Sequence, residues 1–193
     1  MRVKRCALRV FRFFRFSCHF STILLLPYGF FRTFVIMKII LLVVGKTTDP
    51  HFAASFEDYR KRLSHYVSFE MEVIPELRQT RALSGEQQKE QEGRLILERL
   101  QPGDRVVLLD EHGSERRSID FAAWLDKRMA SGVRRLVFVI GGPYGFSPAV
   151  YERGDEMVSL SQMTLSHQMI RLLFAEQLYR AFTILRHEPY HHE

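Results

Sequence analysis

The stretch MKIILLVVG, residues 37–45, separates two parts of the chain that differ in composition. Its unbroken apolar run is typical of a central parallel strand, which is buried on both faces and so does not alternate apolar and polar positions. Residues 1–36 hold 7 of the 28 basic residues, 8 of the 16 phenylalanines, both cysteines and no acidic residue. The sequence therefore divides into a leader, residues 1–36, and a body, residues 37–193.

The leader permits four interpretations. Arg12 and Arg15 interrupt its first aromatic run and no small-residue cleavage site follows, which disfavours a signal peptide. Pro27 and Arg32 break the roughly 20 apolar residues that a membrane span needs. Its arginines and lack of acidic residues suit an organelle transit peptide better, although so many phenylalanines are unusual for one. We favour the fourth interpretation, a translation start at Met37, and expect the leader to lie outside the folded domain.

The basic character of the chain belongs to the leader. The body holds 21 basic and 22 acidic residues, a net charge of −1, whereas the whole chain has a pI of about 9.5. The absence of cysteine after residue 36 excludes a disulfide framework, a thiolate metal site and a catalytic thiol in the body. A near-neutral body also lacks the positive charge of a non-specific nucleic-acid binder. We expect a cytoplasmic protein that binds no metal and no membrane.

Hydrophobic periodicity predicts alternating strands and helices in the body, hence one α/β domain with a mostly parallel sheet flanked by helices. The predicted strands are residues 39–44, 69–74, 105–110, 134–140 and about 157–160. The predicted helices are residues 50–66, 84–100, 118–131 and 164–185. Ser84 and Gln87 form a capping box for the second helix, and Ser118 is expected to cap the third.

Three segments, residues 110–113, 141–145 and 161–166, leave predicted strands at the edge where open parallel sheets bind ligands. In GGPYG (141–145), three glycines around a proline let backbone amides approach a ligand without interference from a Cβ atom. Segment 161–166 adds hydroxyl and free N–H groups. We expect a pocket of backbone donors and acceptors for a small, flat, polar cofactor, the alternative being a simple turn. Neither the G-x-G-x-x-G dinucleotide motif nor a P-loop is present.

The C-terminal third carries specific motifs: VFVIGGPYGFSPAV (137–150), then SLSQMTLSHQMIRLLFAEQLYRAFTILRHEPYHHE (159–193). The order of IGGPxG, S-x-x-T-x-x-H, L-x-x-E-x-L-Y-R-A and a PYH tail resembles the RlmH family of SPOUT-class methyltransferases. These enzymes methylate N3 of a pseudouridine in large-subunit (23S) ribosomal RNA, and the resemblance extends over the whole body. It implies a SPOUT domain over residues 37–193.

The resemblance also implies S-adenosyl-L-methionine (SAM) as cofactor, held in a deep trefoil knot made by the C-terminal strands and helix. It further implies a homodimer in which the last helix packs against its partner. A fully buried core helix is the alternative explanation of that helix's apolar sequence. The positions that match the family's cofactor contacts are Leu109, Gly142, Ser161, Gln162, Met163, Thr164, Leu165 and Ser166.

Methylation of a ring nitrogen requires a collinear donor and acceptor and removal of the nitrogen's proton. Without a cysteine, the body cannot form the covalent adduct used for carbon methylation of pyrimidines. The candidates for proton handling and base positioning are His167, Arg171, Arg180, Tyr190, His191 and His192. We select Tyr190, His191 and Arg171 as catalytic or substrate-positioning residues.

Each candidate also has a structural interpretation. His167 could cap the last helix, Arg180 could have a structural partner, and the tail around Tyr190 could be frayed. His192 occupies the position where family members commonly carry arginine, so a contact to phosphate or base there would require a protonated histidine.

The near-neutral charge of the body predicts recognition of shape on an assembled ribosome rather than of naked RNA. Three basic pairs could form a local patch on a dimer, namely Arg78 with Arg81, Arg116 with Arg117, and Arg134 with Arg135. Three alternatives stay open at this point: a non-enzymatic α/β ligand-binding module, a SPOUT enzyme acting on another RNA such as tRNA, and a metalloenzyme using His187, His191 and His192.

Overall fold

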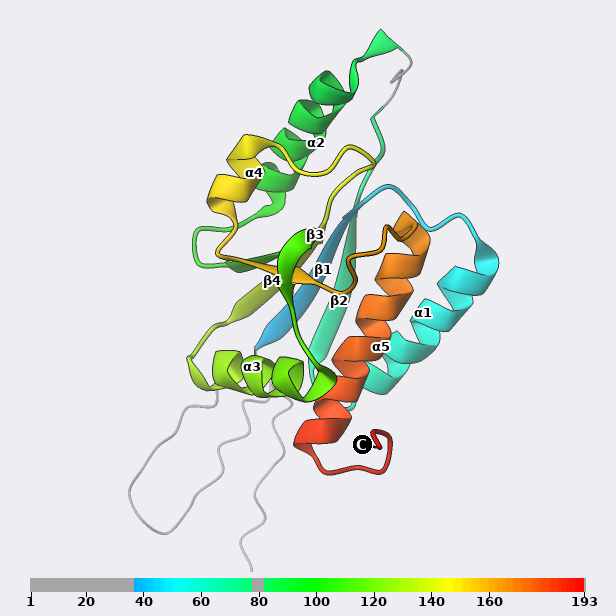
Figure 1. Cartoon of the computed structure of the whole chain (residues 1–193), viewed down its shortest axis with the longest axis vertical. Helices are drawn as coiled ribbons and strands as arrows, with labels where there is room; N and C mark the ends of the chain where they lie inside the picture. The colour runs from blue at the N-terminus through cyan, green and yellow to red at the C-terminus, as the bar shows by residue number, and fades with distance from the viewer. Residues whose placement is uncertain (1–36, 78–81, 193) are drawn as a thin grey trace, which may run out of the picture. The chain divides into compact units, whose positions relative to one another are not determined.

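The computed structural model describes residues 37–77 and 82–192 (Figure 1). The strands form one five-stranded parallel sheet in the order β2-β1-β4-β3-β5. In chain order the elements are β1 (Lys38–Val44), α1 (Pro50–Leu63), β2 (Ser68–Ile74), α2 (Gly85–Arg99), β3 (Arg105–Glu115), α3 (Ser118–Ala130), β4 (Arg135–Ile140), α4 (Pro148–Arg153), β5 (Glu156–Ser159) and α5 (His167–Leu185). The predicted fold class, a parallel sheet flanked by helices, is confirmed. The leader and the pair Arg78 and Arg81 lie outside the described residues, so what we expect of them stays a prediction.

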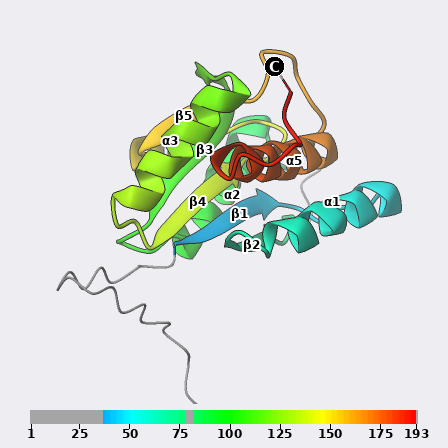
Figure 2. The ribbon, with the colours of Figure 1, turned by 90° about the horizontal axis from the view of Figure 1, so that it is seen from below.

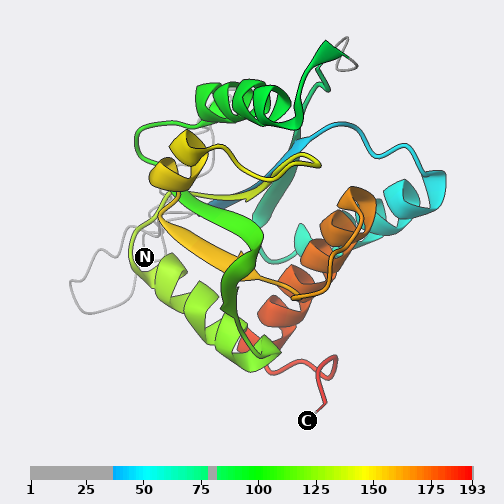
Figure 3. The ribbon, with the colours of Figure 1, turned by 45° about the horizontal axis from the view of Figure 1, so that its top comes forward.

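The sheet is covered on both faces, which explains the unbroken apolar run of β1. Helices α1, α3 and α5 lie on one face (Figure 2) and α2 and α4 on the other (Figure 3). Residues Ile39, Leu41 and Val43 belong to the core under α1, α3 and α5. Residues Ile40, Leu42 and Val44 belong to the core under α2 and α4. Every position of the strand between Ile39 and Val44 is thus buried.

Helix α5 is more apolar than its place in the core requires. Phe174, Leu178 and Phe182 are buried, and the ring of Phe174 lies 4.6 Å from that of Phe138 on β4. Leu172 and Leu173 are only half-buried in the single chain. The alternative of a fully buried core helix therefore does not hold in the single chain, where part of the apolar surface of α5 stays accessible.

The helix starts only partly follow the sequence predictions. The capping box of α2 is confirmed, because Ser84 Oγ accepts a hydrogen bond from the Gln87 amide (3.2 Å) and Gln87 Oε1 accepts one from the Ser84 amide (3.0 Å). The expected cap of α3 is wrong, because Ser118 is its first helical residue and donates instead to Gln177.

The last helix begins three residues later than expected. Ser166 Oγ accepts a hydrogen bond from the Met169 amide (3.3 Å), so the helix starts at His167 and not at residue 164. Ser166 thus performs the capping role that was the structural interpretation of His167, which leaves the His167 side chain available for another role.

Strand β3 continues beyond its predicted end at Asp110 as far as Glu115. Its pairing with β5 shifts register, so that Leu109 and Ser114 both pair with Val158. Between them Gly113 lies against the backbone of β5, where an added Cβ atom would come within 2.7 Å of Val158. Sequence periodicity misses this extension because its residues are polar. The trefoil knot stays a prediction.

Strand β5 is held at its start by a group of hydrogen bonds on Glu156. Its carboxylate accepts from Trp124 Nε1 (2.8 Å), Arg105 Nη2 (3.0 Å) and both Nε and Nη2 of Arg128. Burial alone would raise the pKa of Glu156, but the bonds from Trp124, Arg128 and Arg105 outweigh it and lower the pKa. The ionised carboxylate is therefore the form that stabilises the fold.

Glu156→Gln is expected to lower the free energy of unfolding at pH 7 by about 2 kcal/mol, because bonds to a charged acceptor become bonds to a neutral one. The difference in the free energy of unfolding between wild type and Glu156→Gln should be fully present above the ordinary glutamate pKa of about 4.3. It should disappear as the pH falls through the lowered pKa of Glu156 in the folded protein. Urea unfolding from pH 7 to pH 3 measures it, with Glu152→Gln on the exposed side of α4 as control. A difference between Glu156→Gln and wild type that stays constant over that range would contradict the assignment.

Candidate functional site

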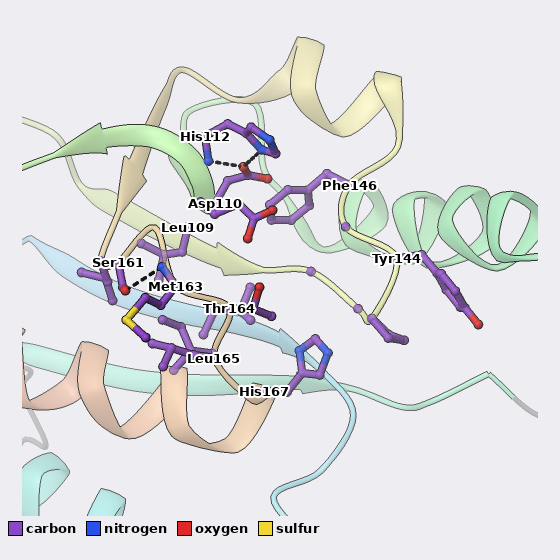
Figure 4. A pocket seen from close by; sticks show the side chains of 18 of the residues that line it. Leu109, Asp110, His112, Tyr144, Phe146, Ser161, Met163, Thr164, Leu165 and His167 are labelled. Carbon is purple, nitrogen blue, oxygen red and sulfur yellow. Dashed lines mark hydrogen bonds and ion pairs between the residues drawn. The ribbon is translucent and has the colours of Figure 1, made fainter.

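The three strand-end segments meet around a cavity of about 460 Å³ at the carboxyl edge of the sheet (Figure 4). We call it the first cavity. Six of the eight predicted cofactor positions line it, namely Leu109, Gly142, Ser161, Met163, Thr164 and Leu165. Gln162 and Ser166 belong to the same loop but do not line the cavity. The cavity thus lies where the parallel sheet was expected to bind a ligand.

One wall of the first cavity is main chain. In the GGPYG loop, the Gly145 amide donates to the Gly142 carbonyl (3.1 Å), and Gly145 has a φ of +79°, a conformation that favours glycine. On the opposite wall the Met163 amide donates to Ser161 Oγ (2.9 Å), which turns the loop ahead of α5. These two turns expose backbone donors and acceptors to a ligand.

Asp110 contributes a carboxylate to the first cavity. It accepts hydrogen bonds from the His112 amide (2.8 Å) and from the Tyr151 hydroxyl (2.8 Å), and its side chain is 9% exposed. Burial alone would raise the pKa of Asp110, but these bonds and the His112 ring outweigh it and lower the pKa. Burial and the Asp110 carboxylate raise the pKa of Tyr151 to about 12, so Tyr151 stays a donor. Asp110 begins the strand-end segment 110–113 that the sequence predicted, although it was not among the predicted cofactor positions.

A buried glutamate lies beneath the glycine-rich loop. Glu92 on α2 is 3% exposed, and a Cβ atom added to Gly142 would come within 1.9 Å of its Oε2. Its Oε1 accepts from Gln88 (2.8 Å), whereas Oε2 has no hydrogen-bond partner among the described residues. Burial raises the pKa of Glu92. The carboxyl group therefore sets the distance between the glycine-rich loop and α2. The polar sequence pattern of α2 did not indicate this role.

Arg171, a predicted catalytic residue, ties α5 to the end of β1. It is 2% exposed, and its Nη2 donates to the Val44 carbonyl (2.7 Å) while its Nη1 donates to Thr47 Oγ1 (3.0 Å). Gln168, one turn earlier, accepts from the Asp49 amide (2.8 Å). Arg171 lines a cavity next to the first one but not the first one itself.

Tyr190 and His191, the other predicted catalytic residues, lie at the opposite end of α5 from the first cavity. The Tyr190 ring packs edge-on against Tyr179 (4.8 Å between centroids), and its hydroxyl donates to Glu176 (3.2 Å). His191 Nδ1 lies 3.5 Å from Arg180, which also bonds to Glu176, as expected of a structural partner. The tail is therefore packed as far as Tyr190 and not frayed.

The length of α5 keeps the tail away from the cavity. Its 19 residues span about 27 Å, and its first turn lines the first cavity whereas the tail follows its last turn. Within one chain the structure therefore does not bring Tyr190 and His191 to the cavity.

The described residues hold neither a cluster of metal ligands nor a helix that could span a membrane. Within residues 37–77 and 82–192, no group of three or more His, Cys, Asp or Glu side chains is placed to hold a metal ion. No helix in these same ranges is long and apolar enough to cross a membrane.

Comparison with solved structures gives a weak similarity. The crystal structure of the SpoU methyltransferase AviRb from Streptomyces viridochromogenes, in complex with the cofactor AdoMet, matches with a TM-score of 0.39 and 15% identity. The match covers 79% of this chain and 59% of that chain, and it is too low to support an argument.

Sequence comparison is far stronger. The family described as "Predicted SPOUT methyltransferase" matches residues 37–191. The protein named ribosomal RNA large subunit methyltransferase H from Phocaeicola vulgatus is 60% identical over 157 residues, which cover 81% of this chain and all of that protein. The protein of the same name from Porphyromonas gingivalis is 64% identical with the same coverage. On this match and these identities, the chain belongs to the SPOUT methyltransferase family.

Proposed function

We propose that this chain transfers the methyl group of SAM to N3 of a pseudouridine in large-subunit ribosomal RNA. The observation that carries the proposal is the identity of 60% and 64% to two proteins named ribosomal RNA large subunit methyltransferase H, over their whole length. The nitrogen target is the one implied by the motif resemblance, and it agrees with a body that has no cysteine for carbon methylation.

The residues of the first cavity fit SAM. Leu109 and Leu165 offer apolar surface for a flat adenine ring, and the main chain of Gly142 and the 161–166 loop offers hydrogen-bonding groups. The ionised Asp110 carboxylate suits ribose hydroxyls and the positive charge of the cofactor. When bound, SAM supplies an electrophilic methyl group on a positively charged sulfur. This chain's own residues would bind and orient it, and the residues that would hold it are Leu109, Gly142, Ser161 and residues 163–165.

Charge supports an assembled ribosome as the substrate. The near-neutral body has little general attraction for phosphate. Of the predicted basic pair at residues 134–135, Arg135 forms an ion pair with Asp104 (2.8 Å), and Arg116 lies over the Trp124 ring. Because these two arginines already contact Asp104 and Trp124, recognition of the shape of a folded particle has to supply much of the affinity for ribosomal RNA.

A methyl-transfer assay tests the proposal directly. Residues 37–193 are incubated with labelled SAM and one of three acceptors: ribosomes that lack the modification, protein-free ribosomal RNA, or tRNA. We expect label in large-subunit RNA of intact ribosomes and little in the two free RNAs. Label in tRNA alone would replace the proposed substrate, and efficient labelling of protein-free ribosomal RNA would contradict recognition of the assembled particle.

We also propose that the active form is a homodimer in which the tail of one subunit serves the cavity of the other. Two observations support this: the outward apolar residues of α5, such as Leu172 and Leu173, and the separation of Tyr190 and His191 from the first cavity along α5. An isologous, antiparallel pairing of two α5 helices would place each tail near the first turn of the partner helix. Tyr190 and His191 would then position the substrate across the interface.

Complementation between two defective subunits is the corresponding prediction. One subunit carries Gly142→Leu, whose side chain would overlap the Glu92 carboxyl group and displace the loop that lines the first cavity, and the other ends at Pro189. Each is expected to be nearly inactive alone. An equal mixture, unfolded and refolded together, should recover roughly a quarter of wild-type activity, because half of the dimers are mixed and each has one intact site. If the mixture stays inactive although mixed dimers form, the tail does not act across subunits.

A further inference from the structure

A second cavity lies beside the first, at the ends of β1 and β2. It has a volume of about 360 Å³ and is bordered by α2 and by the first turn of α5. Gly142, Pro143 and His167 line both cavities. Within the described part of the chain, the glycine-rich loop and the imidazole ring of His167 thus form the wall between the two spaces.

The strand order explains why two ligands can lie side by side here. The chain leaves β1 toward α1 on one face of the sheet and leaves β4 toward α4 on the other, although β1 and β4 are neighbours. Such a reversal point opens a crevice at the carboxyl ends of the strands, and ligands bind there in α/β proteins. The first cavity lies across the ends of β3 and β4, and the second across the end of β1.

The lining of the second cavity suits a flat, polar ring. Lys46 offers N–H donors, and Glu76, Gln88 and Gln168 add polar groups. The Gln168 amide is held in place by hydrogen bonds with Thr48 and Asp49. At its buried end the cavity also meets Arg171, whose Nε has no hydrogen-bond partner among the described residues. A pyrimidine imide, with an N–H between two carbonyl groups, requires such a mixture of donors and acceptors.

Among the residues that the structure describes, His167 is the one ionisable side chain that lines both cavities. It is half-buried, Ser166 caps the helix in its place, and no hydrogen bond to its ring is found in residues 37–77 and 82–192. Burial, and after it the charge of Arg171, lower the pKa of His167, so the ring is neutral near pH 7. The other titratable or charged groups that line the two cavities are Lys46, Glu76, Glu92 and Arg171 in the second, and Asp110, Glu111, His112, Tyr144 and Tyr151 in the first.

We propose that the second cavity takes the acceptor base, and that His167 accepts the proton from its imide nitrogen. This inference rests on the proposed methyl transfer to a pyrimidine nitrogen. The nitrogen lone pair forms the new bond to the methyl carbon, and the carbon–sulfur bond breaks with both electrons going to sulfur. The imide proton passes to the free lone pair of the imidazole, and the resulting imidazolium later releases it to water. The reaction thus takes place at the wall that the two cavities share.

His167→Asn tests the proton acceptor, with the exposed His65→Asn as matched control. The methyl-transfer rate constant of wild type should rise with pH through a pKa below the ordinary histidine value and then level off. In His167→Asn it should fall about 100-fold or more near pH 7 and keep rising with pH where wild type is level. The SAM dissociation constant, measured by calorimetry, should change much less than the rate constant, because His167 is one of many residues that line the first cavity. An NMR titration of the imidazole C–H signals should assign the lowered pKa to the signal that His167→Asn removes.

Leu77→Trp tests the location of the base, because Leu77 lines the second cavity but not the first. The larger ring should raise KM for the ribosome at unchanged SAM affinity. Met71→Trp, which fills an unrelated cavity near α1, is the control and should behave as wild type.

The outcomes separate this inference from the function on which it rests. If wild type methylates ribosomes while His167→Asn keeps its rate and pH profile, or Leu77→Trp keeps its KM, the inference is wrong and the proposed function stands. If wild type binds SAM but methylates none of the three acceptors, the proposed function itself fails.

Discussion

Replacing Gly113 with alanine is expected to destabilise the fold by about 3 kcal/mol. The added Cβ atom would lie 2.7 Å from the carbonyl carbon and the amide nitrogen of Val158 and 2.8 Å from the carbonyl carbon of Met157. All three atoms are main chain of β5, so no side-chain rotation relieves the overlap. Either the β3 extension or β5 must move. Residues 110–112 of the extension line the first cavity, and β5 leads into the loop at Ser161, which lines it too.

The free energy of unfolding from urea titration measures this effect. Gly103→Ala is the matched control, since a Cβ atom there meets nothing within 4 Å and its φ is not positive. That variant should be neutral or slightly more stable, because alanine reduces the conformational entropy of the unfolded chain. Equal unfolding midpoints for the two alanine variants would show that β3 and β5 do not approach as closely as described.

Gly142→Ala is expected to weaken SAM binding on the order of 10- to 100-fold, because overpacking of about 1–3 kcal/mol falls on the loop that contacts the cofactor. The new Cβ atom would overlap the Glu92 carboxyl group, 1.9 Å from Oε2 and 2.7 Å from Cδ. Glu92 is buried and bonded to Gln88, so the carboxyl group has little room to move and the loop must rise instead. Isothermal titration calorimetry with SAM gives the change in affinity.

A double variant identifies the cause of that loss. Glu92→Ala removes the group that the new Cβ atom would meet, so Gly142→Ala with Glu92→Ala should bind SAM more tightly than Gly142→Ala alone. Such recovery is the non-additivity expected of residues in contact. If the losses of SAM affinity in the two single variants simply add in the double variant, the overlap with Glu92 is not what weakens binding.

Sequence patterns predicted the sheet and its strand-end segments because each rests on a strong local signal. The apolar runs of β1 and β4 require a strand buried on both faces, and the glycines after β4 indicate a close backbone approach. Helix α4 was missed because its six residues, Pro148–Arg153, are too few to show a helical period. The β3 extension was missed because pairing with β5, rather than an apolar pattern, keeps residues 110–115 extended.

The site was less predictable where its geometry depends on segments far apart in sequence. Nothing near Glu92 indicates that its carboxyl group will lie under Gly142, 50 positions later in the chain. Likewise, the hydrogen bond from Arg171 to the Val44 carbonyl follows from the packing of α5 on β1. Tyr190 and His191 were selected as substrate-positioning residues of the PYH tail, and a sequence motif carries no information on which end of α5 faces the cavity.

The main-chain wall of the first cavity also bears on how the site can change through mutation. Peptide N–H and C=O groups are the same for every residue, so side-chain replacement alters such a wall only by moving it. Substitutions therefore change the exposed side chains at the rim, such as Tyr144 and Met163, much more easily than they change the main-chain wall of the cavity. A competitive inhibitor that hydrogen-bonds only to the GGPYG and 161–166 backbones should face few routes to resistance, because most changes that displace those loops also remove the binding of SAM.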